Sequence, residues 1–158
     1  MKHLRNLGII LAVLLVLALT TKAEFTAETI IDAPPEKVWE VLMATEAYPD
    51  WNPTFVRIDG AFEDGEVTNH VLFPDGEIVA IATQVAEATA PNTLKQSGGV
   101  PLLLTFENEW TLTSEGTGTR ARLYEVNNGL YLWLWDESWV EPAYQKVAEA
   151  LKLRAEAL

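Results

Sequence analysis

The 158-residue chain has no cysteine, and its histidines, serines and basic residues are few. Without cysteine there is no disulfide framework, and no thiolate can act as a nucleophile or a metal ligand. Of the two histidines, His3 lies at the extreme N-terminus and His70 in the middle of the chain. One internal histidine is too few for a typical transition-metal site, and no carboxylate spacing resembles a calcium loop. We therefore expect neither a metal nor a cofactor.

The three serines do not indicate nucleophilic catalysis. Ser97, Ser114 and Ser138 all lack the surrounding pattern of a nucleophile elbow. The segment Ser97-Gly98-Gly99 is too short for a phosphate-binding loop, and no helical pattern follows it. The sequence thus assigns no catalytic residue.

Basic residues are outnumbered two to one by acidic residues. Eleven lysines and arginines against 23 aspartates and glutamates give a net charge of −12. This balance argues against nucleic acid as a partner, because phosphate binding needs a basic surface. It also argues against electrostatic docking on anionic lipid. We attribute the acidity to solubility, and the length fits one domain with a substantial core.

The N-terminal segment has the pattern of a secretory signal peptide. Lys2 and Arg5 precede an unbroken apolar run, Leu7 to Leu19, which is followed by Thr-Thr-Lys-Ala. The run falls short of the ~20 residues that a spanning helix needs. We predict a signal peptide over residues 1–23, cleaved after Ala23, and an uncleaved membrane anchor is the alternative. The protein is then exported, secreted or periplasmic, or else tethered to the membrane by this segment.

The last 21 residues predict one long amphipathic helix. Within Ser138–Leu158, apolar residues recur at helical spacing at Val140, Tyr144, Val147 and Leu151, and charged residues occupy the opposite face. Ser138 followed by a glutamate three positions later predicts a capping box. A helix of this length needs a broad apolar surface to cover it, which the strands in the middle of the chain can supply.

Between the two ends, the pattern predicts a strand, two short helices and six further strands. A helix is expected from Pro35 to Ala44, and a single helical turn within Tyr48–Pro53, where two prolines prevent continuation. Asp-Gly and Gly-Thr pairs between apolar runs predict two hairpins. The strands are expected over residues 25–31, 55–59, 66–73, 78–87, 93–96, 102–113 and 119–127, with a flexible loop over 97–101.

Four segments of this pattern carry a family resemblance. They are Ile31–Trp39 (Ile-Asp-Ala-Pro-Pro-Glu-Lys-Val-Trp), Tyr48–Pro53 (Tyr-Pro-Asp-Trp-Asn-Pro), Gly116–Arg120 and Ala150–Glu156. Together they resemble the SRPBCC superfamily, in particular its polyketide cyclase/dehydrase and lipid-transport-like branch. The resemblance covers about residues 25 to 158. Two features depart from it: Pro142, which indicates a later start or a kink in the last helix, and the added N-terminal apolar segment.

The resemblance implies an α+β helix-grip fold over residues 24–158. In this fold a curved seven-stranded antiparallel sheet wraps a long C-terminal helix, with two short helices after the first strand. It also implies a cavity for a small, mostly apolar molecule such as a lipid or a polyketide. Relatives include carriers, polyketide cyclases and protein-interaction modules. We favour binding without turnover because no convergent catalytic set stands out, and keep the cyclase-type enzyme and the interaction module as alternatives.

The second hairpin allows its register to be worked out. If Gly116 and Thr117 are the central turn residues, opposed residues are counted outward from that turn, and alternate residues share a face. One face then carries polar pairs and the other is mostly apolar, so the apolar face points inward. Its pairs are Leu112 with Ala121, Trp110 with Leu123, Asn108 with Glu125 and Phe106 with Asn127.

Glu125 and Asn108 stand side by side on this inward face. Burying a carboxylate without partners is unfavourable, so Glu125 requires hydrogen-bond partners. One hypothesis is structural: Glu125 bonds to Asn108, to a tyrosine, or to backbone near Gly129. The other is that Glu125 and Asn108 orient a hydroxyl or carbonyl group of a ligand.

Aromatic residues supply the other cavity candidates. The run Tyr131–Trp135 either lines a pocket mouth, touches a membrane, or is covered on both sides, as such runs most often are. Trp51 is expected to pack at the loop with its N–H bonded to backbone, and His70 to be a partly exposed strand residue rather than an acid or base. The candidate ligand-binding residues are Asn108, Trp110, Leu123, Glu125, Trp133, Trp135 and Tyr144.

Overall fold

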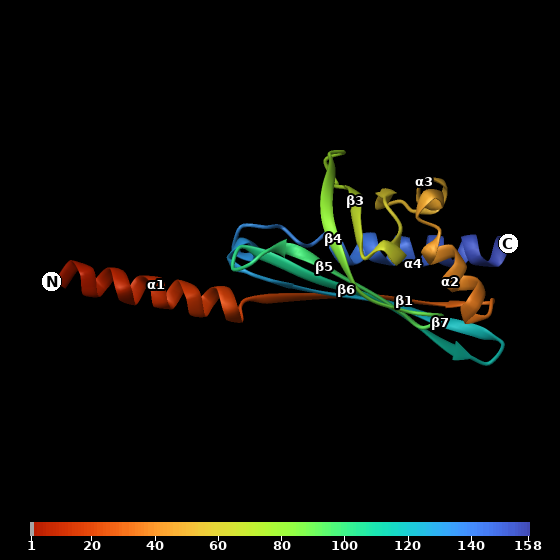
Figure 1. Ribbon diagram of the computed structural model, residues 1–158, viewed down its shortest axis with the longest axis horizontal. Helices are drawn as coiled ribbons and strands as arrows, with labels where there is room; N and C mark the ends of the chain where they lie inside the picture. The colour runs from red at the N-terminus through yellow and green to blue at the C-terminus, as the bar shows by residue number, and fades with distance from the viewer. Residues whose placement is uncertain (1) are drawn as a thin grey trace.

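The structure, a computed structural model, describes residues 2–158, with side chains from residue 6 onward, so Met1 of the predicted signal segment lies outside it. One apolar helix leads into a mixed domain of strands and helices (Figure 1). The helices are α1 (Lys2–Thr20), α2 (Pro35–Met43), α3 (Tyr48–Trp51) and α4 (Val140–Ala157), with short 3-10 turns at Thr45–Ala47, Phe62–Asp64 and Leu130–Trp133. The strands are β1 (Lys22–Ile31), β2 (Phe55–Asp59), β3 (Glu66–Leu72), β4 (Ile78–Thr89), β5 (Thr93–Val100), β6 (Leu104–Glu115) and β7 (Gly118–Asn128).

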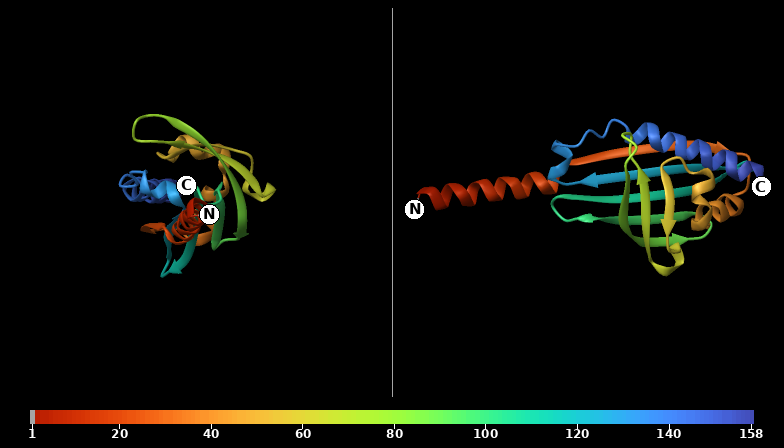
Figure 2. Two further views of the ribbon diagram at one scale, coloured as in Figure 1. Left: turned by 90° about the vertical axis from the view of Figure 1, so that its left-hand side faces the viewer. Right: turned by 90° about the horizontal axis from the view of Figure 1, so that it is seen from above.

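The seven strands form one antiparallel sheet in the order β1-β7-β6-β5-β4-β3-β2. Each strand from β2 to β7 pairs with its sequence neighbour, and β1 closes the order by pairing with β7. The sheet curves, and α4 lies along its concave side (Figure 2). Two short helices follow β1. The predicted helix-grip fold is confirmed.

Helix α4 packs against β1, β7 and α2. Its buried residues recur every three or four positions, from Val140 through Tyr144 and Leu151 to Ala155. The predicted capping box is wrong: the helix begins at Val140, and Trp139 precedes it without a side-chain cap. The backbone N–H of Ser138 instead donates to Asp136 Oδ1 at 3.2 Å. The helix therefore starts late enough to place Pro142 in its first turn, where a missing N–H needs no partner.

The short helices α2 and α3 close one end of the sheet. Proline at the first position of α2 fixes a helical φ, and Val38, Val41 and Leu42 bury one face. In α3, the ring of Trp51 packs 4.9 Å from that of Tyr48, centroid to centroid. The predicted bond from Trp51 to backbone is wrong, because its indole N–H is buried without a partner among the described residues.

Strand positions agree best with the sequence pattern where a tight turn joins two strands. The register predicted for β6 and β7 is confirmed from Glu115 opposite Gly118 outward, including Asn108 opposite Glu125. The flexible loop predicted over residues 97–101 is wrong, since β5 runs on to Val100 and pairs with β6. Glycine at 98 permits this, because a Cβ there would lie 2.7 Å from the ring of Phe106.

Helix α1 joins β1 with almost no linker and projects from one end of the domain (Figure 1). The predicted cleavage position after Ala23 falls inside β1, where Lys22 pairs with Asn128 and Ala23 with Asn127. The apolar side chains of α1 from Leu7 on are largely exposed, apart from those of Leu17 and Ala18. Within residues 2–158, no helix has both the length and the apolarity needed to cross a membrane.

The hydrophobic core fills one end of the space between sheet and helices. Fully buried residues from β1, α2, β6 and α4 meet there, among them Ile31, Val38, Leu112 and Leu151. Toward the other end, where α4 begins, larger polar and aromatic side chains replace the close-packed aliphatic ones. The core therefore gives way to a cavity along the same concave face.

Candidate ligand-binding site

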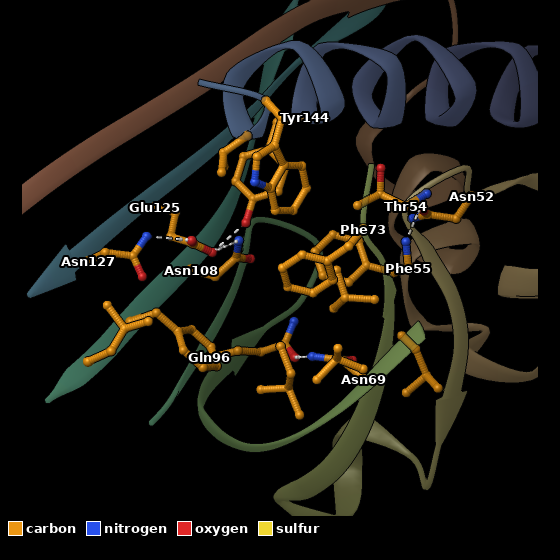
Figure 3. Close-up of a pocket in the computed structure, with 18 of the residues that line it drawn as sticks. Asn52, Thr54, Phe55, Asn69, Phe73, Gln96, Asn108, Glu125, Asn127 and Tyr144 are labelled. Carbon is orange, nitrogen blue, oxygen red and sulfur yellow. Dashed lines mark hydrogen bonds between the residues drawn. The ribbon is translucent and has the colours of Figure 1, made fainter. Parts of the chain in front are cut away.

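A cavity of about 480 Å³ lies between the concave face of the sheet and the first turns of α4. This volume is within the range of small-molecule sites, which is roughly 300–1,000 Å³. Strands β2 to β7 contribute the floor and one wall, and α4 with the segment before it contributes the other (Figure 3). Most of the lining is apolar or aromatic, and the polar side chains in it form a definite pattern.

A row of polar residues crosses the floor from strand to strand. Glu125 on β7 pairs with Asn108 on β6, which in turn pairs with Gln96 on β5. Asn69 on β3 continues the row through a side-chain hydrogen bond from its Nδ2 to Gln96 Oε1 at 3.2 Å. Because each of these residues has the same position in the pleat, all four face the cavity (Figure 3).

Glu125 is the most heavily hydrogen-bonded member of the row. Its Oε2 accepts from the Tyr144 hydroxyl at 2.5 Å and from Asn108 Nδ2 at 3.0 Å, and its Oε1 accepts from Asn127 Nδ2 at 2.8 Å. The residue is 7% exposed. Three donors and no acceptor around it are the environment of an ionised carboxylate. No lysine, arginine or histidine within residues 6–158 forms an ion pair with it.

Tyr144 serves this network as a donor. Burial, and then the adjacent Glu125 carboxyl, raise the pKa of the Tyr144 phenol well above its ordinary value. The phenol therefore keeps its proton at neutral pH and holds the carboxyl in place. Its ring also stacks on Phe55, with centroids 6.2 Å apart. Tyr144 thereby links α4 to both sides of the cavity.

At the Asn69 end of the row, the polar side chains are largely hydrogen-bonded to one another and to backbone. Asn69 Nδ2 also donates to Thr83 Oγ1 at 3.1 Å, and that hydroxyl donates to the Ile81 carbonyl at 3.2 Å. Asn69 Oδ1 is buried without a hydrogen-bond partner in the described part of the chain. Such an orphan acceptor is unfavourable by roughly 1–3 kcal/mol. Gln96 Oε1 accepts the hydrogen bond from Asn69, while Gln96 Nε2 makes no hydrogen bond among the described residues.

Aromatic rings frame the side of the cavity away from this floor. Trp139 lies 5.0 Å from Phe73 and 6.3 Å from Trp135, centroid to centroid. Phe73 comes from the end of β3 and the tryptophans from the segment leading into α4, so the rings bridge the sheet and the helix. Glu77, in the turn between β3 and β4, borders the cavity and is exposed.

The structure brings five of the seven predicted site residues to the cavity: Asn108, Trp110, Glu125, Trp135 and Tyr144. The other two are placed elsewhere. Leu123 faces inward as predicted, but it is fully buried in the filled part of the core. Trp133 is 57% exposed, and its indole N–H donates to Thr21 Oγ1 at 3.1 Å, so it lies outside the cavity.

The run Tyr131–Trp135 is not covered, contrary to the commonest expectation. Tyr131, Trp133 and Leu134 are exposed, with Leu134 at 84%. Tyr131 and Trp135 border the cavity. The 3-10 turn at Leu130–Trp133 causes this mixture, because it directs successive side chains to different sides.

Sequence reasoning missed the polar and aromatic residues on the earlier strands. Asn69, Gln96, Phe55 and Phe73 line the cavity without having been singled out. Alternation offered a signal for Asn69, since Val67 and Val71 flank it on the inward face of β3. Joining it to Gln96 and Asn108 required the register of four strands, β3 to β6, in which β4 lies between Asn69 and Gln96.

His70 points to the other face of the sheet. Its Nε2 lies 2.8 Å from Asp59 Oδ2, and Asp59 is also held by Arg57. This agrees with a partly exposed strand histidine and removes it from the cavity. Among the described residues, no group of histidine, cysteine and acidic side chains could hold a metal ion.

Comparison with known proteins places these observations in a family. Residues 22–156 match the family model described as polyketide cyclase / dehydrase and lipid transport. No curated protein matches the chain in sequence.

Several solved structures share the fold. The protein TTHA0849 from Thermus thermophilus has 19% identity and a TM-score of 0.71, over 85% of this chain and 98% of that one. The Zhui aromatase/cyclase from Streptomyces sp. R1128 has 18% identity and a TM-score of 0.68, over 86% and 94%. The di-domain ARO/CYC StfQ of the steffimycin biosynthetic pathway has 12% identity and a TM-score of 0.72, over 86% of this chain and 52% of StfQ. The chain thus spans about half the length of StfQ.

Proposed function

This chain belongs to the polyketide cyclase/dehydrase and lipid transport family, and we propose that it binds a small, mostly apolar molecule in its cavity without converting it. The observation that carries the proposal is the cavity of about 480 Å³ with apolar and aromatic walls and one row of polar side chains. A few placed polar groups in an apolar cleft are typical of small-molecule sites.

The chemistry of the lining supports binding rather than turnover. Among the residues that line the cavity there is no histidine, lysine, cysteine or serine. The buried carboxyl, Glu125, is engaged by three donors, and the proton of Tyr144 is directed at that carboxyl. Both groups would have to leave these partners to act as a base or an acid.

Titration of the purified full chain tests this function. Trp110, Trp135 and Trp139 line the cavity, so an occupant changes their emission. We expect at least one compound from a panel of lipids, sterols and aromatic polyketide-like molecules to change the emission saturably and to raise the thermal midpoint. A panel in which no compound changes either quantity refutes the proposal. Mass spectrometry of a molecule retained through purification would identify the ligand.

A cyclase-type enzyme is the second candidate. Its support is the Glu125–Tyr144 pair inside the cavity, together with fold relatives that are named as aromatase/cyclases. The test is the rate of aldol cyclisation of a poly-β-keto chain with wild type and with Glu125→Gln. Acceleration by wild type that the substitution abolishes establishes this candidate and overturns binding without turnover. The third alternative, a protein-interaction module, requires an exposed apolar patch. A filled core would have favoured it over the other two, and the cavity removes that ground.

We also propose that the domain works outside the cytoplasm, either free or tethered at the membrane face. The support is the basic, apolar and small-residue pattern of residues 1–23. Cells expressing the full chain are fractionated and the N-terminus of the product is sequenced. Soluble cytoplasmic protein that still begins at Met1 refutes the proposal.

A further inference from the structure

We propose that the ligand of the cavity carries no negative charge and presents a hydrogen-bond donor, a hydroxyl or an ammonium group, to the polar row. This inference rests on the proposed binding function and narrows it. It follows from two properties of the lining: the sign of its charges and the kind of hydrogen-bonding atoms that its side chains leave free.

The charges of the lining are all negative. Glu125 lies on the floor and Glu77 at the border, and no lysine, arginine or histidine is among the lining residues. The basic side chains of β5 and β7 face outward: Lys95 pairs with Glu107 and Arg120 with Glu28 and Glu115. Arg122 donates to Thr26 Oγ1 and lies over the ring of Tyr124. A carboxylate or phosphate in the cavity would therefore meet a like charge and no counter-ion.

The size of this repulsion is large enough to select a ligand. Two like charges about 6 Å apart, at an effective dielectric constant of about 20, repel by an energy equivalent to roughly a hundredfold in affinity. Solvent entering beside the ligand weakens the repulsion, so we expect at least roughly tenfold discrimination against an anion.

The amide side chains beside Glu125 keep acceptors free in the cavity. Asn108 and Asn127 each use their Nδ2 on Glu125, so each keeps an Oδ1 that makes no hydrogen bond within residues 6–158. Tyr144 uses its proton on the same carboxyl. Both amide oxygens remain accessible from the cavity, unlike the sealed Asn69 Oδ1. The free donors are Gln96 Nε2 and the second Nδ2 proton of Asn108 and of Asn127, since an amide nitrogen carries two protons. A ligand donor placed there fits these acceptors and the charge of Glu125, whereas a ligand acceptor would face that negative charge.

The aromatic rings suit the same ligands. The faces of Trp139, Trp135 and Phe73 attract a cation as well as an apolar chain. An alcohol and an amine therefore share the required chemistry, and the experiment separates them.

A matched decyl series tests the inference. Decan-1-ol, decylamine and decanoate have the same chain and differ in a neutral, a cationic and an anionic head group at pH 7. Calorimetric titration of the full chain is expected to show binding of the alcohol, the amine or both, with decanoate at least roughly tenfold weaker than the better of the two. Decanoate that binds as tightly as both refutes the inference and leaves the proposed function standing. Binding of none of the three, together with a silent broad panel, refutes the proposed function itself.

Two substitutions then test which charge causes the weaker binding of decanoate. Glu125→Gln keeps the shape and removes the charge, so the disadvantage of decanoate relative to decylamine should shrink at least roughly fivefold. Glu109→Gln removes a charge from the outer face of the neighbouring strand, where Glu109 accepts from Thr111 Oγ1 at 3.0 Å, and should leave the ratio unchanged. Equal changes in both variants mean that net charge sets the preference, which contradicts the assignment to the polar row. If Glu125→Gln does not fold, the wild-type ratio still decides the inference.

A second inference comes from the surface and does not depend on the cavity. We propose that the end of the domain from which α1 leaves contacts the surface of a lipid bilayer. Six large apolar side chains are exposed there, each at least 44% accessible. We call them the apolar end: Val100, Leu102, Leu103, Tyr131, Trp133 and Leu134.

The apolar end is one continuous surface. The backbone N–H groups of Leu130 and Tyr131 donate to the carbonyls of Leu102 and Leu103, at 3.1 and 2.9 Å. Trp133 donates to Thr21, directly after α1. No charged residue occurs between Lys95 and Glu107 or between Glu125 and Asp136. Patches of this kind on a soluble surface mark interaction sites.

Leu102 adds a second, independent sign of function. Its φ is +67°, in the left-handed region that a leucine rarely adopts. This conformation is unfavourable by roughly 1–3 kcal/mol and is typically retained where it serves a function. Here the strained backbone holds the side chain of Leu102 in solvent. In the isolated domain, therefore, no burial of that side chain offsets the strain.

A bilayer is the occupant that matches the surroundings. Helix α1 exposes apolar side chains along most of its length and leaves the domain at this end (Figure 1). Tryptophan and tyrosine are enriched at membrane interfaces, and both occur in the apolar end. The net charge of −12 points to zwitterionic rather than anionic lipid. Tyr131 belongs both to this surface and to the cavity border, so the apolar end adjoins the cavity.

The absence of cysteine makes a clean test possible. Leu134→Cys in the apolar end and Leu153→Cys on α4, also exposed at 69%, are each labelled on the full chain with a fluorophore sensitive to polarity. Phosphatidylcholine vesicles should shift the emission of the label at 134 to the blue and leave that at 153 unchanged. Since α1 is present in both, a response of both labels reports association of the whole chain with the vesicle rather than contact at the apolar end. Equal responses refute the inference, and so does a blue shift that rises with protein concentration without vesicles, which would indicate a second copy of the chain.

Discussion

Replacing Tyr144 by phenylalanine isolates one hydrogen bond of the buried network. The hydroxyl donates to Glu125 Oε2 at 2.5 Å, and the ring stacks on Phe55 with an interplanar angle of 25°. Phenylalanine keeps the ring, its stacking and the helical position, and removes the hydroxyl alone. Glu125 then retains its two amide donors, Asn108 and Asn127.

The magnitude follows from the charge of the acceptor. A hydrogen bond to a charged group contributes about 1.5–3 kcal/mol, more than a neutral one. The hydroxyl is buried, so water cannot fully replace it as the third donor. Removing the hydroxyl also ends the desolvation of a polar group, which offsets part of the loss. We expect Tyr144→Phe to lower the free energy of unfolding by about 2 kcal/mol. For a domain of this size that corresponds to roughly 4–8 °C in thermal midpoint.

The measurement is urea unfolding of wild type and variant, followed by circular dichroism. The slope of the unfolding free energy against urea should stay unchanged, because the same surface becomes exposed. Tyr124→Phe is the matched control, since Tyr124 lies on the outer face of the same strand as Glu125. A loss below about 0.5 kcal/mol for Tyr144→Phe, or an equal loss for Tyr124→Phe, contradicts the reasoning that Glu125 needs the phenol.

Three further predictions test the fold around the site. Burial raises the pKa of Tyr144 in the folded state. The protonated phenol therefore contributes its full stabilisation below about pH 10, and this contribution declines at higher pH. The urea midpoint of the wild type should fall above about pH 10, and that of Tyr144→Phe should fall less steeply. Gly129→Ala should destabilise by about 2 kcal/mol or more, because a Cβ would lie 2.2 Å from a backbone carbonyl, whereas Gly116→Ala, in open space, should lose about 1. A chain starting at Glu24 should unfold at lower urea than one starting at Thr21, because it lacks the first two residue pairs between β1 and β7.

Local patterns in the sequence predicted the parts of this fold that depend on neighbours along the chain. A two-residue turn at Gly116 and Thr117 determined the whole register of β6 and β7, and with it the pairing of Asn108 and Glu125. The helical stripe of α4 predicted that Tyr144 faces inward. In each case the period of the side chains and a short connection leave few alternatives.

The parts that failed depend on contacts between distant segments. Leu123 and Glu125 share a face of one strand, yet Leu123 lies in the filled core and Glu125 in the cavity. What separates them is the position of α4, whose residues fill one end of the space. Likewise, nothing near Asn69 in the sequence indicates that Gln96 lies beside it, because a whole strand and two turns intervene.

The polar row combines a stable hydrogen-bond network with the proposed recognition of a ligand. Its stability uses one set of atoms: the amide nitrogens of Asn108 and Asn127 and the hydroxyl of Tyr144, all directed at Glu125. In the proposed binding, recognition uses another set, the amide oxygens that remain free in the cavity. Because the two sets do not overlap, a ligand binds without breaking the bonds that hold Glu125, and the ligand leaves no unpaired buried charge behind when it departs. The structural and the proposed ligand-orienting roles of Glu125 are therefore compatible, since the two call on different atoms of one network.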